Sequence, residues 1–277
     1  MAQTILLAGC GDLGLRTAVR LLARGDTVWA LRRQPPTDSP DGLRWIQADL
    51  SQPQSLRDLP DNIDRVAYLP APGGRDPQRY RAVFLDGLAH LHAALAGRPR
   101  RWVFVSSSAV YGDHGQDWVD ETTPPAPLAF NGATLLEAET RLRQLEPGAV
   151  SLRLAGLYGP GRLQLLERLR AGQARAPREP AHWANRIHID DAAAAVAHLL
   201  HLPQALPCYL GADDTPMPLD RLYGGLARLL HAPSPGCGPA PAGVGSKRLS
   251  NARLKASGLQ LAWPDTLDGY RALIENR

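Results

Sequence analysis

The feature that most constrains the fold of this chain is a glycine-rich turn between two different hydrophobic patterns. The continuous apolar run 4–8 is typical of a strand buried on both faces, and it leads directly into Gly9-x-Gly11-x-x-Gly14. Apolar residues then recur at helical spacing over 15–22. The N-terminal part of the chain is therefore predicted to form a strand, a tight turn and a helix.

The same alternation continues through the first half of the sequence. Further strands are predicted at 27–31, 44–48, 66–69, 102–105 and 150–154, and long helices at about 77–96 and 132–145. Strands that alternate with helices indicate an α/β fold, a doubly wound parallel sheet of the Rossmann type.

The second half is less regular. Helices are predicted near 162–171, 190–201, 218–230 and 265–275, and the Pro/Gly-rich stretch 231–245 is interpreted as a loop. We expect a nucleotide-binding domain over 1–157 and about 186–212. A smaller substrate-binding region is expected over about 158–185 and 213–277.

Composition excludes several classes of protein. With 44% apolar and 21% charged residues in 277, the chain can bury a globular core, and no apolar run is long enough for a membrane helix. The net charge of +4 comes from basic residues dispersed among 27 acidic ones, which does not indicate nucleic-acid binding. Cys10, Cys208 and Cys237 suggest neither disulfides nor a metal site, so a cytoplasmic location is expected.

The turn itself points to a dinucleotide. Gly9, Gly11 and Gly14 permit a tight turn and let a pyrophosphate approach the backbone, where the positive end of the helix stabilises it. Asp12 and Leu13 belong to the same candidate site. The alternative is a turn that only packs a strand against a helix.

The end of the second strand bears on the kind of dinucleotide. An NAD site of this type places an acid there to bind the ribose 2′-hydroxyl, whereas this strand ends in Arg32-Arg33. Arginines can pair instead with a 2′-phosphate. We therefore predict NADP(H) in preference to NAD(H), the alternative being an exposed Arg pair without that role.

Six motifs in order resemble one family over nearly the whole chain. After Gly9–Gly14 come Ala48-Asp49-Leu50, Ser106–Gly112, Asp120–Pro124, Arg153–Arg162 and Arg186–Asp191. This order resembles the extended short-chain dehydrogenases/reductases, also called the NAD-dependent epimerase/dehydratase family, which implies the Rossmann-type fold.

The resemblance also implies roles for individual residues. Asp49 and Leu50 would border the adenine of the cofactor, and Leu69-Pro70-Ala71 would line the cofactor after the fourth strand. Ser107 matches the catalytic Ser/Thr, which hydrogen-bonds the reacting oxygen of the substrate. The remaining residues that would contact substrate, often a sugar nucleotide in this family, are Ser108, Tyr111, Asn131, Arg162, Arg186 and His188.

The chain departs from the family at its catalytic Tyr-x-x-x-Lys pair. Asn131 stands at the Tyr position and Leu135 at the Lys position, and a shift of one residue gives Phe130 and Thr134. An amide donates a hydrogen bond but does not exchange a proton near neutral pH. Either another group supplies the proton, or the protein binds NADP(H) without turning it over.

Two functional hypotheses remain from the sequence. The first is an oxidoreductase or epimerase/dehydratase-like enzyme acting on a sugar-nucleotide-like or other small polar substrate, with Ser107 as the catalytic residue. The second is an inactive NADP(H)-binding redox sensor or regulatory protein. Because related proteins often dimerise, a homodimer is also possible; substrate and oligomeric state are not specified.

Overall fold

The computed structural model of the chain describes residues 2–275. These residues fall into two compact units. Unit 1 comprises the chain up to Ser107 together with Phe130–Arg153 and Ala193–Tyr209. Unit 2 comprises Ser108–Ala129, Leu154–Ala192 and the residues from Leu210 onward.

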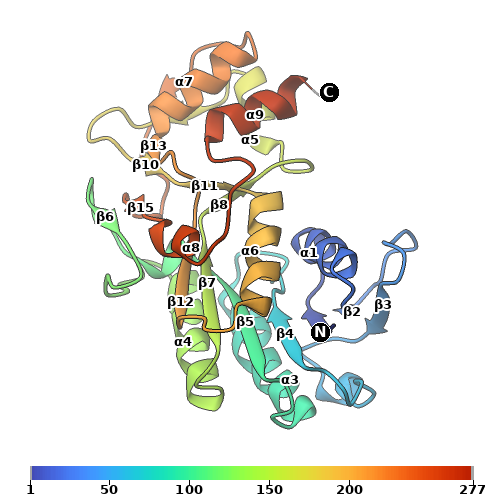
Figure 1. Ribbon diagram of the computed structural model, residues 1–277. Helices are drawn as coiled ribbons and strands as arrows, with labels where there is room; N and C mark the ends of the chain where they lie inside the picture. The colour runs from blue at the N-terminus through green and yellow to red at the C-terminus, as the bar shows by residue number, and fades with distance from the viewer. Residues whose placement is uncertain (1, 276–277) are drawn as a thin grey trace. The chain divides into compact units, whose positions relative to one another are not determined.

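A parallel sheet of seven strands is the principal element (Figure 1). In spatial order its strands are β12 (Cys208–Gly211), β7 (Val150–Leu154), β5 (Arg101–Ser107), β4 (Arg65–Tyr68), β1 (Thr4–Ala8), β2 (Thr27–Arg32) and β3 (Arg44–Gln47). The order runs outward from β1 in both directions, which is the doubly wound arrangement predicted from the sequence. Ile5, Leu6 and Leu7 of β1 are fully buried, because the strand is central and covered on both faces.

Helical segments connect these strands. They are α1 (Asp12–Ala23), η1 (Pro53–Leu56), α2 (Pro77–Arg81), η2 (Ala82–Asp86), α3 (Gly87–Leu95), α4 (Phe130–Leu145) and α6 (Ile189–His201). The predicted long helix over 77–96 is interrupted by the π-helical turn η2. The hydroxyl of Tyr68 donates to the carbonyl of Val83 there, which accounts for the break in the regular hydrogen-bond ladder.

Unit 2 is built from short elements. It contains η3 (Ser108–Val110), β6 (Trp118–Val119), β8 (Gly156–Tyr158), α5 (Gln164–Arg170), β9 (Arg175–Ala176), β10 (Trp183–Ala184), β11 (Arg186–His188), β13 (Met217–Pro218), α7 (Leu219–Leu229), β14 (Gly236–Cys237), β15 (Arg248–Leu249), α8 (Ala252–Ala256) and α9 (Thr266–Glu275). Leu166, Leu222 and Leu226 form the centre of its apolar core.

The boundaries of the two units differ from the expected domains chiefly at 108–129. The sequence analysis places this segment in the first domain, whereas it belongs to unit 2. The reason is pairing with a distant strand, since β6 pairs in parallel with β15. Segments 154–157, 186–192 and 210–212 also belong to unit 2.

Several other short elements were not predicted, β12 and β14 among them. Residues 208–211 form β12, a strand of the main sheet. The interpretation of 231–245 as a loop is wrong at Gly236–Cys237, which pairs with β9 as β14. Both strands are short and depend on a partner, so the local sequence carries little signal for them.

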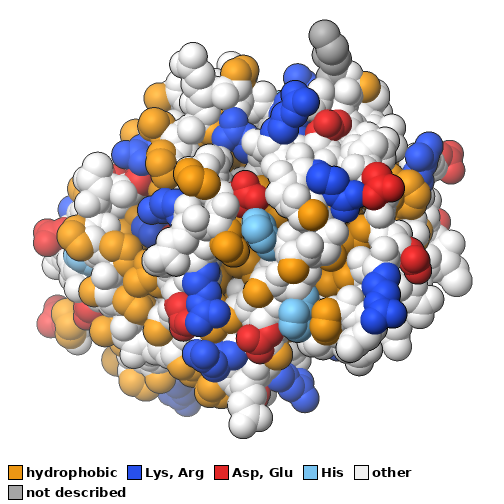
Figure 2. Space-filling view, turned by 90° about the horizontal axis from the view of Figure 1, so that it is seen from below, with side chains coloured by type: hydrophobic (Ala, Val, Ile, Leu, Met, Phe, Trp, Pro, Cys, Tyr) orange, Lys and Arg blue, Asp and Glu red, His pale blue; other side chains and the backbone are white. Residues whose placement is uncertain are grey.

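The surface carries charges of both signs. On the face drawn in Figure 2, Lys and Arg side chains alternate with Asp and Glu, and the described residues form no continuous basic stripe there. No helix within 2–275 has the length and apolar character needed to cross a membrane.

Candidate functional site

The turn between β1 and α1 is shaped by close packing at two of its three glycines. Gly9 has φ +84°, and a Cβ atom there would lie 2.4 Å from the Cα atom of Pro70. A Cβ atom on Gly14 would lie 2.7 Å from the Sγ atom of Cys10. Side chains are therefore excluded at both positions, because the turn packs against the segment that follows β4.

Gly11 differs from its neighbours. A Cβ atom at this position would meet no heavy atom within 4 Å. Gly11 is also the N-cap of α1, and among the described residues no side-chain hydrogen bond caps this helix end. An open backbone at the positive end of a helix can accommodate a phosphate group, so the geometry of the turn fits a pyrophosphate site.

The side chains of the turn do not place a negative charge in the open space at Gly11. Asp12 pairs with Arg16 one helical turn later, at 2.8 Å between Oδ1 and Nε. Leu13 is buried and contributes to the core. Asp12 and Leu13 are both predicted cofactor contacts. Because their side chains are engaged elsewhere, they would contact a cofactor through their backbone.

Two arginines stand at the end of β2, as the sequence predicts. Arg32 is the last residue of the strand, Arg33 follows it, and both are exposed. Burial raises the pKa of the Cys10 thiol to about 12, and the positive charge of Arg32 opposes that rise. Arg32 therefore lies close enough to the glycine turn to act on it electrostatically.

Residues after β3 and β4 complete this edge of the sheet. The Asp49 carboxylate accepts hydrogen bonds from the backbone and hydroxyl of Ser51, and Leu50 is buried. Leu69 donates its backbone N–H to Ala8 at 2.9 Å. The predicted segment Leu69-Pro70-Ala71 therefore adjoins the glycine turn.

The end of β5 carries a buried polar network. Ser106 Oγ lies 2.5 Å from Glu139 Oε1, and Arg153 Nη2 lies 2.6 Å from Glu139 Oε2. Glu139 and Arg153 are 2% and 5% exposed, so this is a buried ion pair. It joins β5, α4 and β7 directly beside Ser107, the last residue of β5.

The two positions that the sequence resemblance assigns to the catalytic pair lie in the first turns of α4. Asn131 is half-buried, and its Oδ1 atom has no hydrogen-bond partner among the described residues. Leu135, one turn later, is buried. This part of α4 offers a hydrogen-bonding amide and an apolar side chain, but no group that titrates near neutral pH.

The other predicted substrate contacts belong to unit 2. Ser108 begins η3, and the buried Tyr111 donates its hydroxyl to the carbonyl of Asp120 at 3.0 Å. Arg162 follows β8, with its backbone N–H bonded to Gly159. Arg186 lies on β11 and hydrogen-bonds the side chain of Tyr270, which leaves Tyr111 and Arg186 with structural partners.

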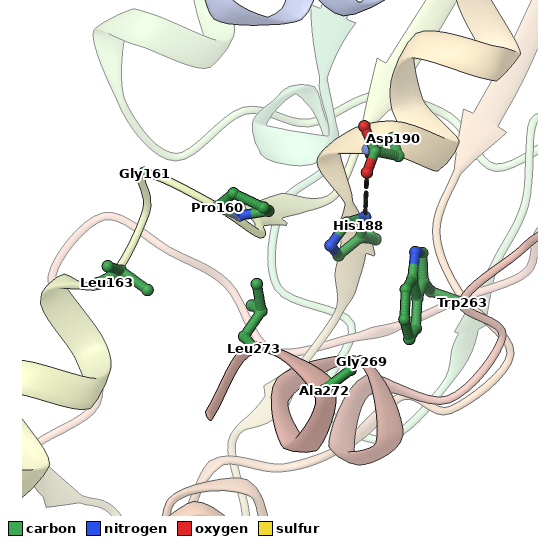
Figure 3. Close-up of a pocket in the computed structure, with 9 residues that line it drawn as sticks. All are labelled: Pro160, Gly161, Leu163, His188, Asp190, Trp263, Gly269, Ala272 and Leu273. Atoms are coloured by element: carbon green, nitrogen blue, oxygen red, sulfur yellow. Dashed lines mark hydrogen bonds and ion pairs between the residues drawn. The ribbon is translucent and has the colours of Figure 1, made fainter. Parts of the chain in front are cut away.

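Unit 2 also contains a pocket of about 320 Å³ (Figure 3). His188 and Asp190 supply its polar groups, and Asp190 donates its backbone N–H to His188 Nδ1 at 3.2 Å. The rest of the lining is Pro160, Gly161, Leu163, Trp263, Gly269, Ala272 and Leu273.

His188 is thus a pocket residue, as the sequence analysis expects of a substrate contact, whereas Arg162 and Arg186 are not part of the lining. The centroid of the His188 ring lies 5.1 Å from that of the Trp263 ring. Asp191 holds the chain next to Trp263, because its carboxylate accepts the backbone N–H groups of Ala262 and Trp263. Sequence reasoning missed Trp263, since no local motif links it to the distant His188.

Residues 5–209 match the profile of the "NAD dependent epimerase/dehydratase family". Protein YeeZ of Escherichia coli K12 is 33% identical over 242 residues, covering 82% of this chain and 84% of its own.

Two solved structures share the fold. One, from Methylobacillus flagellatus and assigned to the NAD-dependent epimerases/dehydratases, is 37% identical with a TM-score of 0.85, covering 100% of this chain and 99% of its own. The other is a UDP-glucose 4-epimerase of Thermus thermophilus in complex with NAD, with 22% identity and a TM-score of 0.81. It covers 99% of this chain and 98% of its own.

Proposed function

Since the chain belongs to the NAD-dependent epimerase/dehydratase family, we propose that unit 1 binds NADP(H) for chemistry on a sugar-nucleotide-like or other small polar substrate. The observation that carries the proposal is the contrast within the glycine turn. Gly9 and Gly14 are packed against protein atoms, while Gly11 faces open space at the start of α1. A turn that served packing alone would not require a glycine at position 11.

The preference for NADP(H) over NAD(H) rests on the end of β2. No acidic residue stands at the end of β2 to accept a hydrogen bond from a ribose 2′-hydroxyl. Two exposed arginines occupy this position. Neither Arg32 nor Arg33 forms an ion pair with a described residue, so both guanidinium groups are available to a 2′-phosphate.

A nicotinamide cofactor supplies hydride transfer when it is bound. Ser107, at the carboxyl end of β5, would donate a hydrogen bond to the reacting oxygen of the substrate. Asn131 can orient that oxygen but cannot exchange its proton, and loss of a positioned acid/base commonly costs about 10²–10⁴ in rate. We therefore expect slow turnover, or a proton supplied from outside the usual pair.

A second function is favoured by two residues of α4. Asn131 and Leu135 replace both members of the catalytic pair, which is the pattern of a protein that binds NADP(H) and does not consume it. In that case the cofactor would act as a redox signal. A protein that binds NADPH tightly and shows no turnover with any sugar nucleotide would support this alternative.

Calorimetric titration with NADPH and with NADH tests the proposal. We expect NADPH to bind at least about tenfold more tightly, because two charge-assisted contacts are lost with NADH. Replacing both arginines (Arg32→Gln with Arg33→Gln) should remove that preference and leave NADH affinity nearly unchanged. Arg24→Gln, an exposed arginine at the opposite end of α1, is the matched control.

Two results would contradict the assignment. Equal affinities for NADPH and NADH in the wild-type protein would exclude the role of Arg32 and Arg33. Absence of binding by both nucleotides would remove the oxidoreductase hypothesis, because the glycine turn would then serve packing only.

A further inference from the structure

Unit 2 contains an arginine whose charge is held by aromatic rings and by no carboxylate. The guanidinium carbon of Arg248 lies 4.9 Å from the ring centroid of Trp118 and 5.0 Å from that of Trp183. Within residues 2–275 its side chain forms no ion pair and donates no hydrogen bond, and its Nε atom is buried without a partner. Residues 2–275 therefore provide this cation with aromatic faces but with no acceptor.

The backbone fixes this arrangement. Arg248 pairs with Trp118 in the register of β15 and β6, and it donates its N–H to the carbonyl of Asp117 at 3.0 Å. The neighbouring residues Lys247 and Leu249 are buried, so Arg248 points to the opposite side of β15. Figure 1 shows β6, β10 and β15, which carry the three side chains, on the same side of unit 2.

The second ring, that of Trp183, is positioned by a separate set of contacts. Trp183 donates its backbone N–H to Ser246 Oγ at 3.0 Å, and Asn185 bonds the backbone of both Lys247 and Leu249. The indole Nε1 atom of Trp183 is also buried without a hydrogen-bond partner. Two donors without acceptors, Arg248 Nε and Trp183 Nε1, thus belong to one cluster.

Two other arginines of unit 2 do have partners. Arg253, five residues later, lies 3.4 Å from the carboxylate of Glu121, and Arg186 bonds Tyr270. A cation that is partly buried and lacks an anion is unfavourable unless something else supplies the negative charge. Aromatic contacts hold the planar guanidinium in place while leaving the edge formed by its two Nη atoms, away from the buried Nε, free to bind two oxygens at once.

We propose that Arg248, Trp118 and Trp183 form an oxyanion-binding site, in which the guanidinium edge binds a carboxylate or phosphate of a small ligand. The 55% exposed Trp118 ring leaves the site open to solvent. That this ligand is the substrate rests on the proposed function; the binding of an oxyanion by unit 2 does not.

Tryptophan fluorescence at constant ionic strength tests the site, with sodium pyrophosphate in one titration and sodium succinate in another. We expect a saturable change with one or both, and a loss of at least tenfold in affinity in Arg248→Met. Arg248→Lys keeps the charge but not the planar pair of guanidinium N–H donors, so its affinity for the anion should fall at least threefold. A circular dichroism melt establishes that each variant is folded.

Arg44→Met is the matched control, because Arg44 is an exposed arginine 5.4 Å from the ring of Trp29 in unit 1. It should bind the anion as the wild type does. Saturation by pyrophosphate alone identifies a phosphate site, and saturation by succinate alone a carboxylate site. The proposal is overturned by the absence of saturation with both, by unchanged affinity in Arg248→Lys, or by an equal loss in Arg44→Met.

The nicotinamide titration on the same preparation keeps the two proposals separate. Anion binding without NADPH binding would remove the proposed function and leave this site intact. NADPH binding without anion binding would do the reverse.

Discussion

Glycines with a positive φ in this chain are required for two different reasons. At Gly25, φ is +89° and a Cβ atom would meet nothing within 4 Å, so only the backbone conformation opposes a side chain. At Gly9, φ is +84° and Pro70 also occupies the space of a side chain. The first constraint is local to the helix end, and the second ties β1 to the segment after β4.

This difference predicts unequal effects of alanine. Gly25→Ala should lower the free energy of unfolding by about 1–2 kcal/mol, the cost of a left-handed conformation. Gly9→Ala should cost about 3 kcal/mol or more, since crowding adds to it, and should weaken NADPH binding. Urea unfolding of the two variants measures the difference, and equal losses would show that Pro70 moves away at little cost.

Ser107 is the residue on which catalysis depends in the proposed function. If the protein turns over a substrate, Ser107→Ala should lower kcat by about 10²-fold or more, because a donor to the reacting oxygen is lost. NADPH affinity should stay within about twofold of wild type. Steady-state kinetics with a calorimetric control checks this, and full activity in the variant would exclude the role of Ser107.

At the scale of elements, the start of α4 differs from its later part. Its first turns lack titratable groups at Asn131 and Leu135, whereas Glu139 further along the helix forms a buried pair with Arg153. That pair joins α4 to β7 and, through Ser106, to the end of β5. The attachment of the helix to the sheet therefore does not depend on the residues at 131 and 135.

The buried pair should matter more to stability than a surface pair on the same helix. Glu139→Gln leaves Arg153 buried beside a neutral amide and should cost about 3–5 kcal/mol of unfolding free energy. Glu137→Gln removes a pair with Arg141 on the exposed side and should cost less than about 1 kcal/mol. Urea denaturation compares them; similar losses would mean that the buried charges are solvated in solution.

At the scale of the whole molecule, a buried carboxyl in unit 2 predicts a pH dependence of stability. Asp213 is 2% exposed, and burial raises its pKa from 3.8 to about 7. Its carboxylate accepts hydrogen bonds from the Thr266 hydroxyl, at the start of α9, and from the backbone of Thr215. The folded state therefore holds this proton more tightly than the unfolded state does.

Because the folded protein binds more protons between pH 4 and pH 7, the contribution of Asp213 to stability falls as pH rises through that range. The full effect is of the order of 4 kcal/mol at most. Asp213→Asn should remove this effect. The free energy of unfolding of the variant should therefore rise relative to that of the wild type from pH 5 to pH 8. Burial lowers the pKa of His182, which acts in the opposite direction in both proteins.

Unfolding midpoints in urea at several pH values, followed by a signal from unit 2, provide the measurement. A constant difference between wild type and Asp213→Asn across pH 5–8 would show that the Asp213 carboxyl is ionised throughout.

Much of unit 1 could be predicted from the sequence, because its strands and helices have strong local patterns. The run Thr4–Ala8, the glycine turn and the helix after it all lie where their periodicity indicates. The signal fails where an element depends on a partner. Residues 118–119 form β6 only because β15 pairs with them, and no local pattern could place 108–129 in unit 2.

The sequence by itself determined the doubly wound sheet, the positions of the glycine turn and of Arg32-Arg33, and the presence of Asn131 and Leu135 where the resemblance expects the catalytic pair. Each of these is a property of neighbouring residues, and neighbours are bonded in a fixed order. The tertiary structure alone decided that Gly11 faces open space, that Glu139 meets Arg153, and that Arg248 contacts two tryptophans with no carboxylate partner in residues 2–275. These depend on contacts between residues distant in the chain, which only folding brings together.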